Sequence, residues 1–151
     1  MDFRTLQAGQ EIDALIAEKV FGWRHLTAEE LAIIQTFASQ ERHWMGEPGA
    51  KDCVFMLTPS DGIRWATGWS GRIDGAWPVV EKLRERGYTF SLVAAIKFGE
   101  TEETSRKGWI AGFTYPTGLT EDDWAETAPL AICRAALRAV TDWRRRDKEI
   151  D

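Results

Sequence analysis

The sequence predicts a single α+β domain in which an antiparallel sheet lies between helical layers. Its 151 residues can bury one ordinary hydrophobic core, so the segment 1–151 is treated as one domain. Apolar residues recur at helical spacing near both ends and in the middle of the chain. Between these stretches lie short apolar or alternating runs separated by turn-forming residues, which is typical of antiparallel hairpins.

Two helices are expected in the first third of the chain. The first is predicted over residues 8–20, and Gly22 suits the left-handed conformation that ends many helices. Its apolar stripe consists of Ile12, Leu15, Ile16 and Val20. A second helix is predicted after Thr27, because Thr27 and Glu30 have the spacing of a capping box. Its stripe consists of Leu31, Ile33, Ile34 and Phe37, and the Gly-Glu-Pro-Gly stretch at 46–49 is predicted to be a loop.

Two hairpins are expected in the middle of the chain. The apolar run 53–58 and the alternating run 63–67 flank a turn cluster and should pair. The strand 89–98 is apolar at successive positions, so we expect it to be central and covered on both faces. Residues 108–115 should return alongside it after a charged loop, 99–107.

Two further helices complete the predicted fold. The middle helix should hold Pro78 in its first turn, where a missing N–H costs little, and end at Gly87. Its buried residues are expected to be Trp77, Val79, Val80 and Leu83. Residues 117–128 are polar and acidic, with Trp124 as the one large apolar residue. The last helix should run from about Pro129 towards Arg145, with a stripe of Leu130, Cys133, Leu137 and Val140.

Charge and composition argue against several classes of protein. A net charge of −5 and a pI near 5.1 disfavour a duplex nucleic-acid binder, which needs a basic face. No apolar stretch approaches the roughly 20 residues of a membrane span, and the first residues lack the shape of a signal peptide. Cys53 and Cys133 lie in apolar surroundings without metal-type spacing. We therefore expect core cysteines in a reduced cytoplasm, with no membrane partner.

Tryptophan is unusually frequent in this chain. There are eight tryptophans, where an average domain of this length carries about two. Five of them lie at predicted element edges, where an indole can form a pocket wall or a contact surface. These five are Trp23, Trp44, Trp65, Trp69 and Trp77.

The sequence contains no recognisable catalytic signature. The stretch 68–72, Gly-Trp-Ser-Gly-Arg, departs from a nucleophile elbow because Arg72 replaces the last glycine. His25 and His43 are not spaced as helical metal ligands. The acidic pairs are interpreted as solvated faces: Glu29-Glu30, Glu102-Glu103 and Asp122-Asp123. We therefore predict a binding protein without metal or cofactor, and keep a nucleotide hydrolase as a weaker alternative.

One constellation favours a ligand site. Ser70 to Gly75 is a glycine-containing turn just before a helix, where free N–H groups, helped by Ser70 and Arg72, could hold a phosphate. Trp69 and Trp77 bracket the turn, and Trp65 lies on the strand that precedes it. An indole stacked on a base together with a held phosphate would suit a nucleotide-type small molecule.

A purely structural interpretation of the same residues remains open. Asp74 could simply cap its helix, with Arg72 solvated. Arg134, beside the apolar stripe of the last helix, is a further candidate for contact with an anion. It could equally pair with Asp13 or another carboxylate.

Three segments resemble the phage ABA sandwich domain family. Residues 9–23 resemble the family's N-terminal helix, 74–83 its middle helix and 127–140 its terminal helix, in the family's order. The chain departs from the pattern by an added helix and loop at 27–51 and by Pro78. The resemblance implies an antiparallel sheet between helical layers and a phage or prophage origin.

The resemblance and the tryptophans lead to one functional hypothesis. The protein would bind and sequester a nucleotide-derived host immune signal in the host cytoplasm. An ADP-ribose derivative made by a TIR-domain enzyme is an example, so that Thoeris-like immunity would be inhibited. The alternative is an assembly or host-takeover protein that acts through protein contacts. Exposed edge strands and edge aromatics also predict a homodimer or a higher homo-oligomer.

Overall fold

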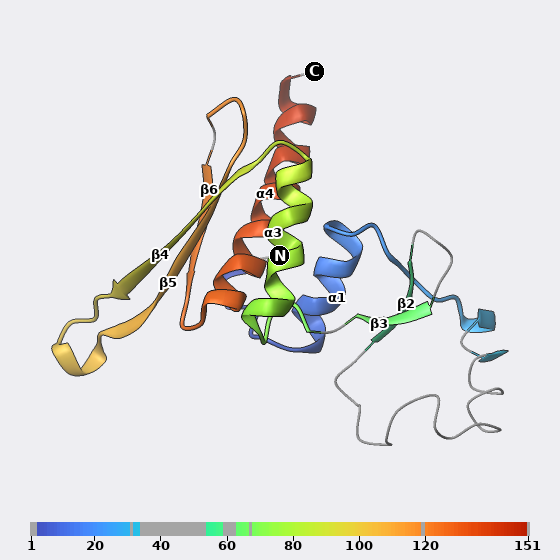
Figure 1. Ribbon diagram of the computed structural model, residues 1–151, viewed down its shortest axis with the longest axis horizontal. Coiled ribbons are helices and arrows are strands. Elements are labelled where there is room, and N and C mark those ends of the chain that lie inside the picture. Colours follow the sequence, from blue (N-terminus) through green and yellow to red (C-terminus); the bar gives the residue numbers. More distant parts are fainter. Residues whose placement is uncertain are drawn as a thin grey trace.

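The computed structural model confirms an α+β domain with an antiparallel sheet packed against helices (Figure 1). It describes residues 3–30, 32–33, 54–58, 63–66, 68–118 and 120–150. The elements in chain order are η1 (Phe3–Thr5), α1 (Gln10–Lys19), β1 (Arg24–His25), β2 (Val54–Leu57), β3 (Ile63–Ala66), α3 (Ile73–Glu85), β4 (Thr89–Lys97), η2 (Glu102–Thr104), β5 (Arg106–Thr114), β6 (Thr120–Ala125) and α4 (Ala128–Ile150). None of the helices in these ranges is long and apolar enough to cross a membrane.

Helix α4 is the centre of the packing. It contacts β5 and β6 on one side, and α3 and α1 on the others. Figure 1 shows α3 and α4 together on one face of the β4–β5–β6 sheet, with α1 and then β2 and β3 beyond them. The predicted stripe of α4 is confirmed, since it is buried at Leu130, Cys133, Leu137 and Val140. Cys133 is a free thiol whose pKa is raised by burial and then by the nearby Asp13 carboxylate.

The main sheet is antiparallel in the order β4–β5–β6. The pairing of residues 89–98 with 108–115 is confirmed, but the prediction that 89–98 is a central, doubly covered strand is wrong. β4 is an edge strand, and Val93 on its outer face is 57% exposed. β5 is central because a third strand, β6, follows it. β6 was missed because its inward residues Glu121 and Asp123 are acidic, which hides the apolar alternation of a strand.

Helix α1 follows its predicted stripe closely. Ile12, Ile16 and Val20 are fully buried, and Leu15 packs against the core. Gly22 has a φ of +74°, the left-handed conformation expected after a helix. There the N–H of Trp23 bonds the carbonyl of Ala17 at 2.9 Å.

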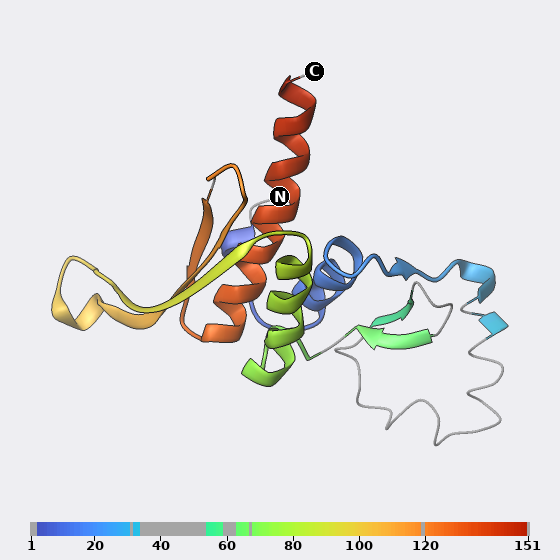
Figure 2. The same ribbon diagram turned by 45° about the horizontal axis from the view of Figure 1, so that its top comes forward.

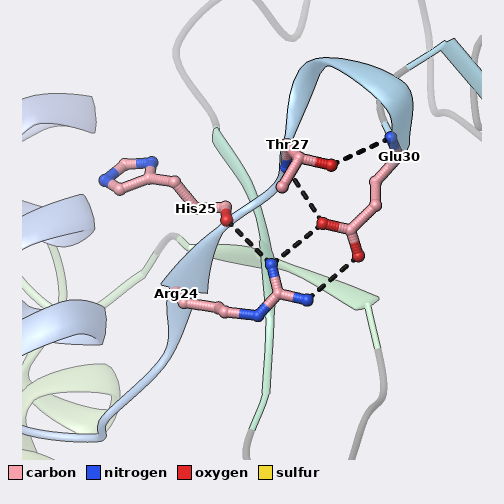
Figure 3. Close-up of polar contacts among 4 residues, drawn as sticks. All are labelled: Arg24, His25, Thr27 and Glu30. Carbon is pink, nitrogen blue, oxygen red and sulfur yellow. Dashed lines mark hydrogen bonds and ion pairs between the residues drawn. The ribbon is translucent and has the colours of Figure 1, made fainter.

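The capping box is confirmed (Figure 3). The N–H of Glu30 donates to Thr27 Oγ1 at 3.2 Å, and the N–H of Thr27 donates to Glu30 Oε1 at 3.0 Å. Residues 28–30 and 32–33 are helical, and Ile33, expected in a buried stripe, is 58% exposed. Leu31, Ile34 and Phe37, the loop 46–49 and Trp44 lie outside the described residues, as does Cys53.

The first hairpin is also confirmed. β2 and β3 pair antiparallel, with Leu57 opposite Ile63, and the short strand β1 adds to the free side of β2. The middle helix corrects one prediction. Pro78 is the sixth residue of α3 rather than a first-turn residue, because the helix already begins at Ile73. Gly87, with a φ of +97°, follows the end of this helix as expected.

Candidate functional site

The predicted phosphate-binding turn already holds an anion that belongs to the chain itself. The carboxylate of Asp13, from α1, accepts the N–H of Ser70 at 2.9 Å and the N–H of Gly68 at 3.2 Å. Ser70 is only 1% exposed, and its Oγ accepts the N–H of Gly9 at 3.1 Å. Of these two donors only Ser70 belongs to the predicted turn 70–75, and the anion they bind is a side chain of the protein. In the structure these donors join α1 to the start of α3.

Arg72 and Asp74 form an exposed ion pair beside this turn. Arg72 Nε lies 3.1 Å from Asp74 Oδ1. Arg72 occupies the N-cap position of α3, and no side chain caps the helix there. Asp74 accepts the N–H of its neighbour Gly75 instead. The pair stands in solvent at the helix start, and its predicted contact with a ligand stays a prediction.

The predicted tryptophans do not gather around the turn as one surface. Trp69 is buried and packs in the core, stacked on Phe21 at 5.3 Å and edge-on to the half-buried Trp23 at 5.2 Å. Trp77, expected in the core, is 48% exposed and makes a T-shaped contact with Phe90 of β4 at 6.2 Å. Trp65 lies on β3, and its side chain is outside the described part of the structure.

A cavity of about 370 Å³ lies elsewhere, beside β6 and the first turns of α4. Its walls come from η1 and the residues after it, from the ends of β4 and β6, from the start of β5 and from α4. Four cationic side chains line it against two acidic ones, although the whole chain carries a net charge of −5. The lining residues are Arg4, Gln7, Lys97, Arg106, Asp123, Trp124, Glu126, Leu130 and Arg134.

Arg134 is the one predicted site residue in this cavity. It is 6% exposed. Its Nε and Nη2 donate to the carbonyl of Leu6 at 2.8 and 2.6 Å, and its Nη1 donates to the carbonyl of Trp124 at 3.1 Å. Of the two alternatives for Arg134, structural pairing with Asp13 or another carboxylate is not what these bonds show, because all three go to backbone carbonyls. Because its partners are neutral carbonyls, the guanidinium is fixed in place while its positive charge remains available to the cavity.

Trp124 supplies the aromatic wall. Lys97 Nζ lies 5.2 Å from the centre of its ring, a cation–π contact. The indole lies across Gly108 of the neighbouring strand, where a Cβ would come within 2.5 Å of Trp124 Cζ2. Its Nε1 is buried and has no hydrogen-bond acceptor among the described residues.

Asp123 is the buried acid of the cavity, so the interpretation of Asp122-Asp123 as a solvated face fails for Asp123. Burial raises the pKa of its carboxyl, while hydrogen bonding from the Trp124 N–H and the charges of Arg138, Arg134 and Arg4 lower it. Asp123 Oδ1 accepts that N–H at 2.9 Å. The second acid, Glu126, is paired with Arg106 at 2.6 Å.

Most of this cavity was not recognised in the sequence. Its residues come from positions 4 to 134, and the two signals present were Arg134 beside an apolar stripe and the isolated Trp124. Among the described residues, no group of three or more metal-ligating side chains gathers.

The fold and the cavity define a small α+β protein whose antiparallel sheet packs on a central helix and borders a basic pocket. A family model for the phage ABA sandwich domain matches residues 14–137, and the chain belongs to this family. It is accordingly a phage protein, and the resemblance seen in its three helices is confirmed. No curated protein and no solved structure matches the chain.

Proposed function

We propose that this phage protein binds a nucleotide-derived anion in the basic cavity and withholds it from the host without chemical turnover. The observation that carries the proposal is the gathering of four cationic side chains and one indole around about 370 Å³. That volume falls within the range of about 300–1,000 Å³ typical of small-molecule pockets. An acidic chain has no general reason to gather cations in this way.

The chemistry of the walls fits such a ligand. Guanidinium groups bind phosphate oxygens through paired N–H donors, and Arg134 is already held rigid by three backbone hydrogen bonds. Preorganisation of this kind lowers the entropic cost of binding. A base would stack on the Trp124 ring by displacing Lys97 from above it, and the displaced ammonium group would then be free to bind a phosphate.

The phage origin of the protein supports a proposal for the biological use of this binding. A phage protein that captures a nucleotide signal in the host cytoplasm would silence the immune response which depends on that signal. An ADP-ribose derivative made by a TIR-domain enzyme is the ligand class we propose, with inhibition of Thoeris-like immunity as the outcome.

The first experiment separates the classes of function. The purified protein is incubated with ADP-ribose derivatives, separated from free ligand and denatured, and the released material is analysed. Release of the intact compound supports sequestration, whereas release of an altered product would indicate an enzyme. Absence of retention would overturn the proposal.

A second experiment locates the site by calorimetry with ADP-ribose as the probe. Arg106→Gln removes an exposed cavity cation, and Arg72→Gln removes an exposed cation at the predicted turn. A charge-assisted hydrogen bond contributes roughly 1.5–3 kcal/mol, so Arg106→Gln should weaken binding roughly ten- to hundredfold. Arg72→Gln should leave binding unchanged. The reverse result would place the ligand at the glycine turn.

A protein-contact function is the second candidate, because large apolar side chains are exposed on the sheet. Phe98 is 83% exposed, and Ile96 is 50% exposed. They lie on the β4–β5 hairpin, which extends away from the helices (Figure 2). A host or virion protein captured through this hairpin, together with no nucleotide retention, would favour this function.

A further inference from the structure

The outer edge of β4 is an unpaired strand edge of unusual length. β4 is nine residues long, Thr89–Lys97, and pairs with β5 along its whole length on one side. In the part of the chain that the structure describes, no strand pairs with its other side. Every second residue of an edge strand turns its N–H and C=O outward, so β4 offers a ladder that another strand can complete.

This edge lacks the features that usually prevent pairing. Edge strands are commonly protected by proline, by inward-pointing charges or by several lysines. β4 has the sequence Thr-Phe-Ser-Leu-Val-Ala-Ala-Ile-Lys, in which the only charged residue is Lys97 at its end. Val93, at the middle of the strand, is apolar and 57% exposed.

The two ends of β4 expose apolar groups on the same face. Phe90 and Leu92 pack against the core, and Ile96 shares their face because side chains alternate along a strand. Ile96 lies towards the far end and is 50% exposed. At the near end, Trp77 of α3 rests edge-on against Phe90 and is 48% exposed.

We propose that a second copy of this chain pairs with β4 in antiparallel fashion, with Val93 of both copies at the two-fold axis. Counting outward from the axis, Ile96 of the second copy then lies directly opposite Phe90, beside Trp77. By symmetry the same contact forms at the other end. The exposed Ile96 of each copy is therefore covered by the exposed Trp77 of the other copy.

The register also avoids placing like charges opposite each other. Lys97 of one copy lies opposite Thr89 of the other, so like charges do not face each other across the new ladder. Leu92 lies opposite Ala94, and both are on the core-facing side. The two three-stranded sheets become one continuous six-stranded sheet, an isologous contact of the kind expected for a two-fold dimer.

The oligomeric state gives the first test. Light scattering of the wild-type protein should give twice the chain mass of 17.1 kDa. Val93→Lys places two ammonium groups against each other on the axis and should give a folded monomer whose melting temperature no longer depends on protein concentration. Val93→Thr, which keeps the shape and the strand propensity, should remain dimeric. A monomeric wild type at micromolar concentration, or a Val93→Lys protein that stays dimeric, would overturn the proposal.

Cysteine crosslinking tests the register. Val93→Cys should form a disulfide-linked dimer on mild oxidation, since facing residues lie roughly 4.5–5.5 Å apart between Cα atoms. Ser91→Cys alone should not, because the two copies of residue 91 would be ~14 Å apart along the strands. Ser91→Cys combined with Ala95→Cys should crosslink, since these positions face each other. Wild type under the same oxidation controls for the native cysteines. Efficient linkage through Ser91→Cys alone would exclude this register.

Discussion

The carboxylate of Asp13 accepts the backbone N–H of Ser70 at 2.9 Å and thereby ties α1 to a turn 57 positions further along the chain. Asp13 is 4% exposed and Ser70 is 1% exposed, so water does not compete for this bond. The same carboxylate also takes the N–H of Gly68. The turn that resembles an anion site is thus a structural joint.

The first prediction concerns this joint. Asp13→Ala leaves two N–H groups without an acceptor, and each buried unsatisfied group costs about 1–3 kcal/mol. We expect the free energy of unfolding, measured with urea, to fall by about 2–5 kcal/mol. Asp13→Asn keeps one acceptor oxygen and should lose less. Asp74→Ala removes an exposed carboxylate near the same turn and is the control. An equal loss of stability in Asp74→Ala would contradict this role for Asp13.

The second prediction concerns the start of α3. A Cβ at Gly75 would lie 1.6 Å from the carbonyl oxygen of Gly68, whereas a Cβ at Gly71 would meet nothing within 4 Å. Gly→Ala inside a helix ordinarily stabilises by about 1 kcal/mol. We expect Gly75→Ala to destabilise instead, by roughly 1–3 kcal/mol, because two backbones must separate. Thermal melts of both variants measure the effect, and Gly71→Ala should leave the melting temperature nearly unchanged. A stabilised Gly75→Ala variant would show that the contact is loose.

The third prediction is a pH dependence at the capping box. Hydrogen bonding from the Arg24 guanidinium, then from Thr27, lowers the pKa of Glu30 from 4.5 to about 2. A carboxyl whose pKa is lower in the folded state stabilises the fold above pH 4.5, and this contribution is lost as the pH falls towards 2. NMR titration of the Glu30 side chain should show the low pKa. Arg24→Gln should raise it towards 4.5, while Arg72→Gln should leave it unchanged.

The fourth prediction concerns the charge of the cavity. Asp123→Asn removes a buried negative charge from the cavity wall, while the amide can still accept the Trp124 N–H. Calorimetry with ADP-ribose should show binding roughly three- to tenfold tighter. The substitution removes the repulsion between the Asp123 carboxylate and the anionic ligand, and solvent screening keeps this repulsion modest. Asp122→Asn makes the same charge change at the next residue, on the opposite face of β6, and should have little effect. Weaker binding in Asp123→Asn would mean that the carboxyl itself contacts the ligand.

The elements that could be predicted are those whose own residues carry a local pattern, such as apolar residues at helical spacing or the spacing of a capping box. Ile12, Ile16 and Leu137 repeat at helical spacing and are buried, and Thr27 and Glu30 form the cap that their spacing indicates. Strand β6 was not predicted from the sequence, because its buried positions include the acidic residues Glu121 and Asp123 where apolar residues would be expected.

The cavity could not be predicted because its chemistry depends on distant partners. Arg134 donates to the carbonyl of Leu6, a residue 128 positions away. Every residue has a backbone carbonyl, so the pattern of side chains cannot predict which carbonyl will accept. The sequence predicted that N–H groups of the turn 70–75 hold a phosphate, and in the structure the Ser70 N–H binds a carboxylate of the chain itself. Only the fold shows that Asp13 fills that role and that Trp69 belongs to the core.

Glycine 108 lies beneath the indole of Trp124, which rests where a Cβ would otherwise stand. The position of this aromatic wall therefore depends on the absence of a side chain at Gly108. The Cβ of an alanine here would come within 2.4 Å of the Ala125 carbonyl oxygen and 2.5 Å of Trp124 Cζ2, so it would displace both the neighbouring strand and the ring. Gly108 therefore fixes where the Trp124 ring lies in the cavity wall, although it is not among the residues that line the cavity.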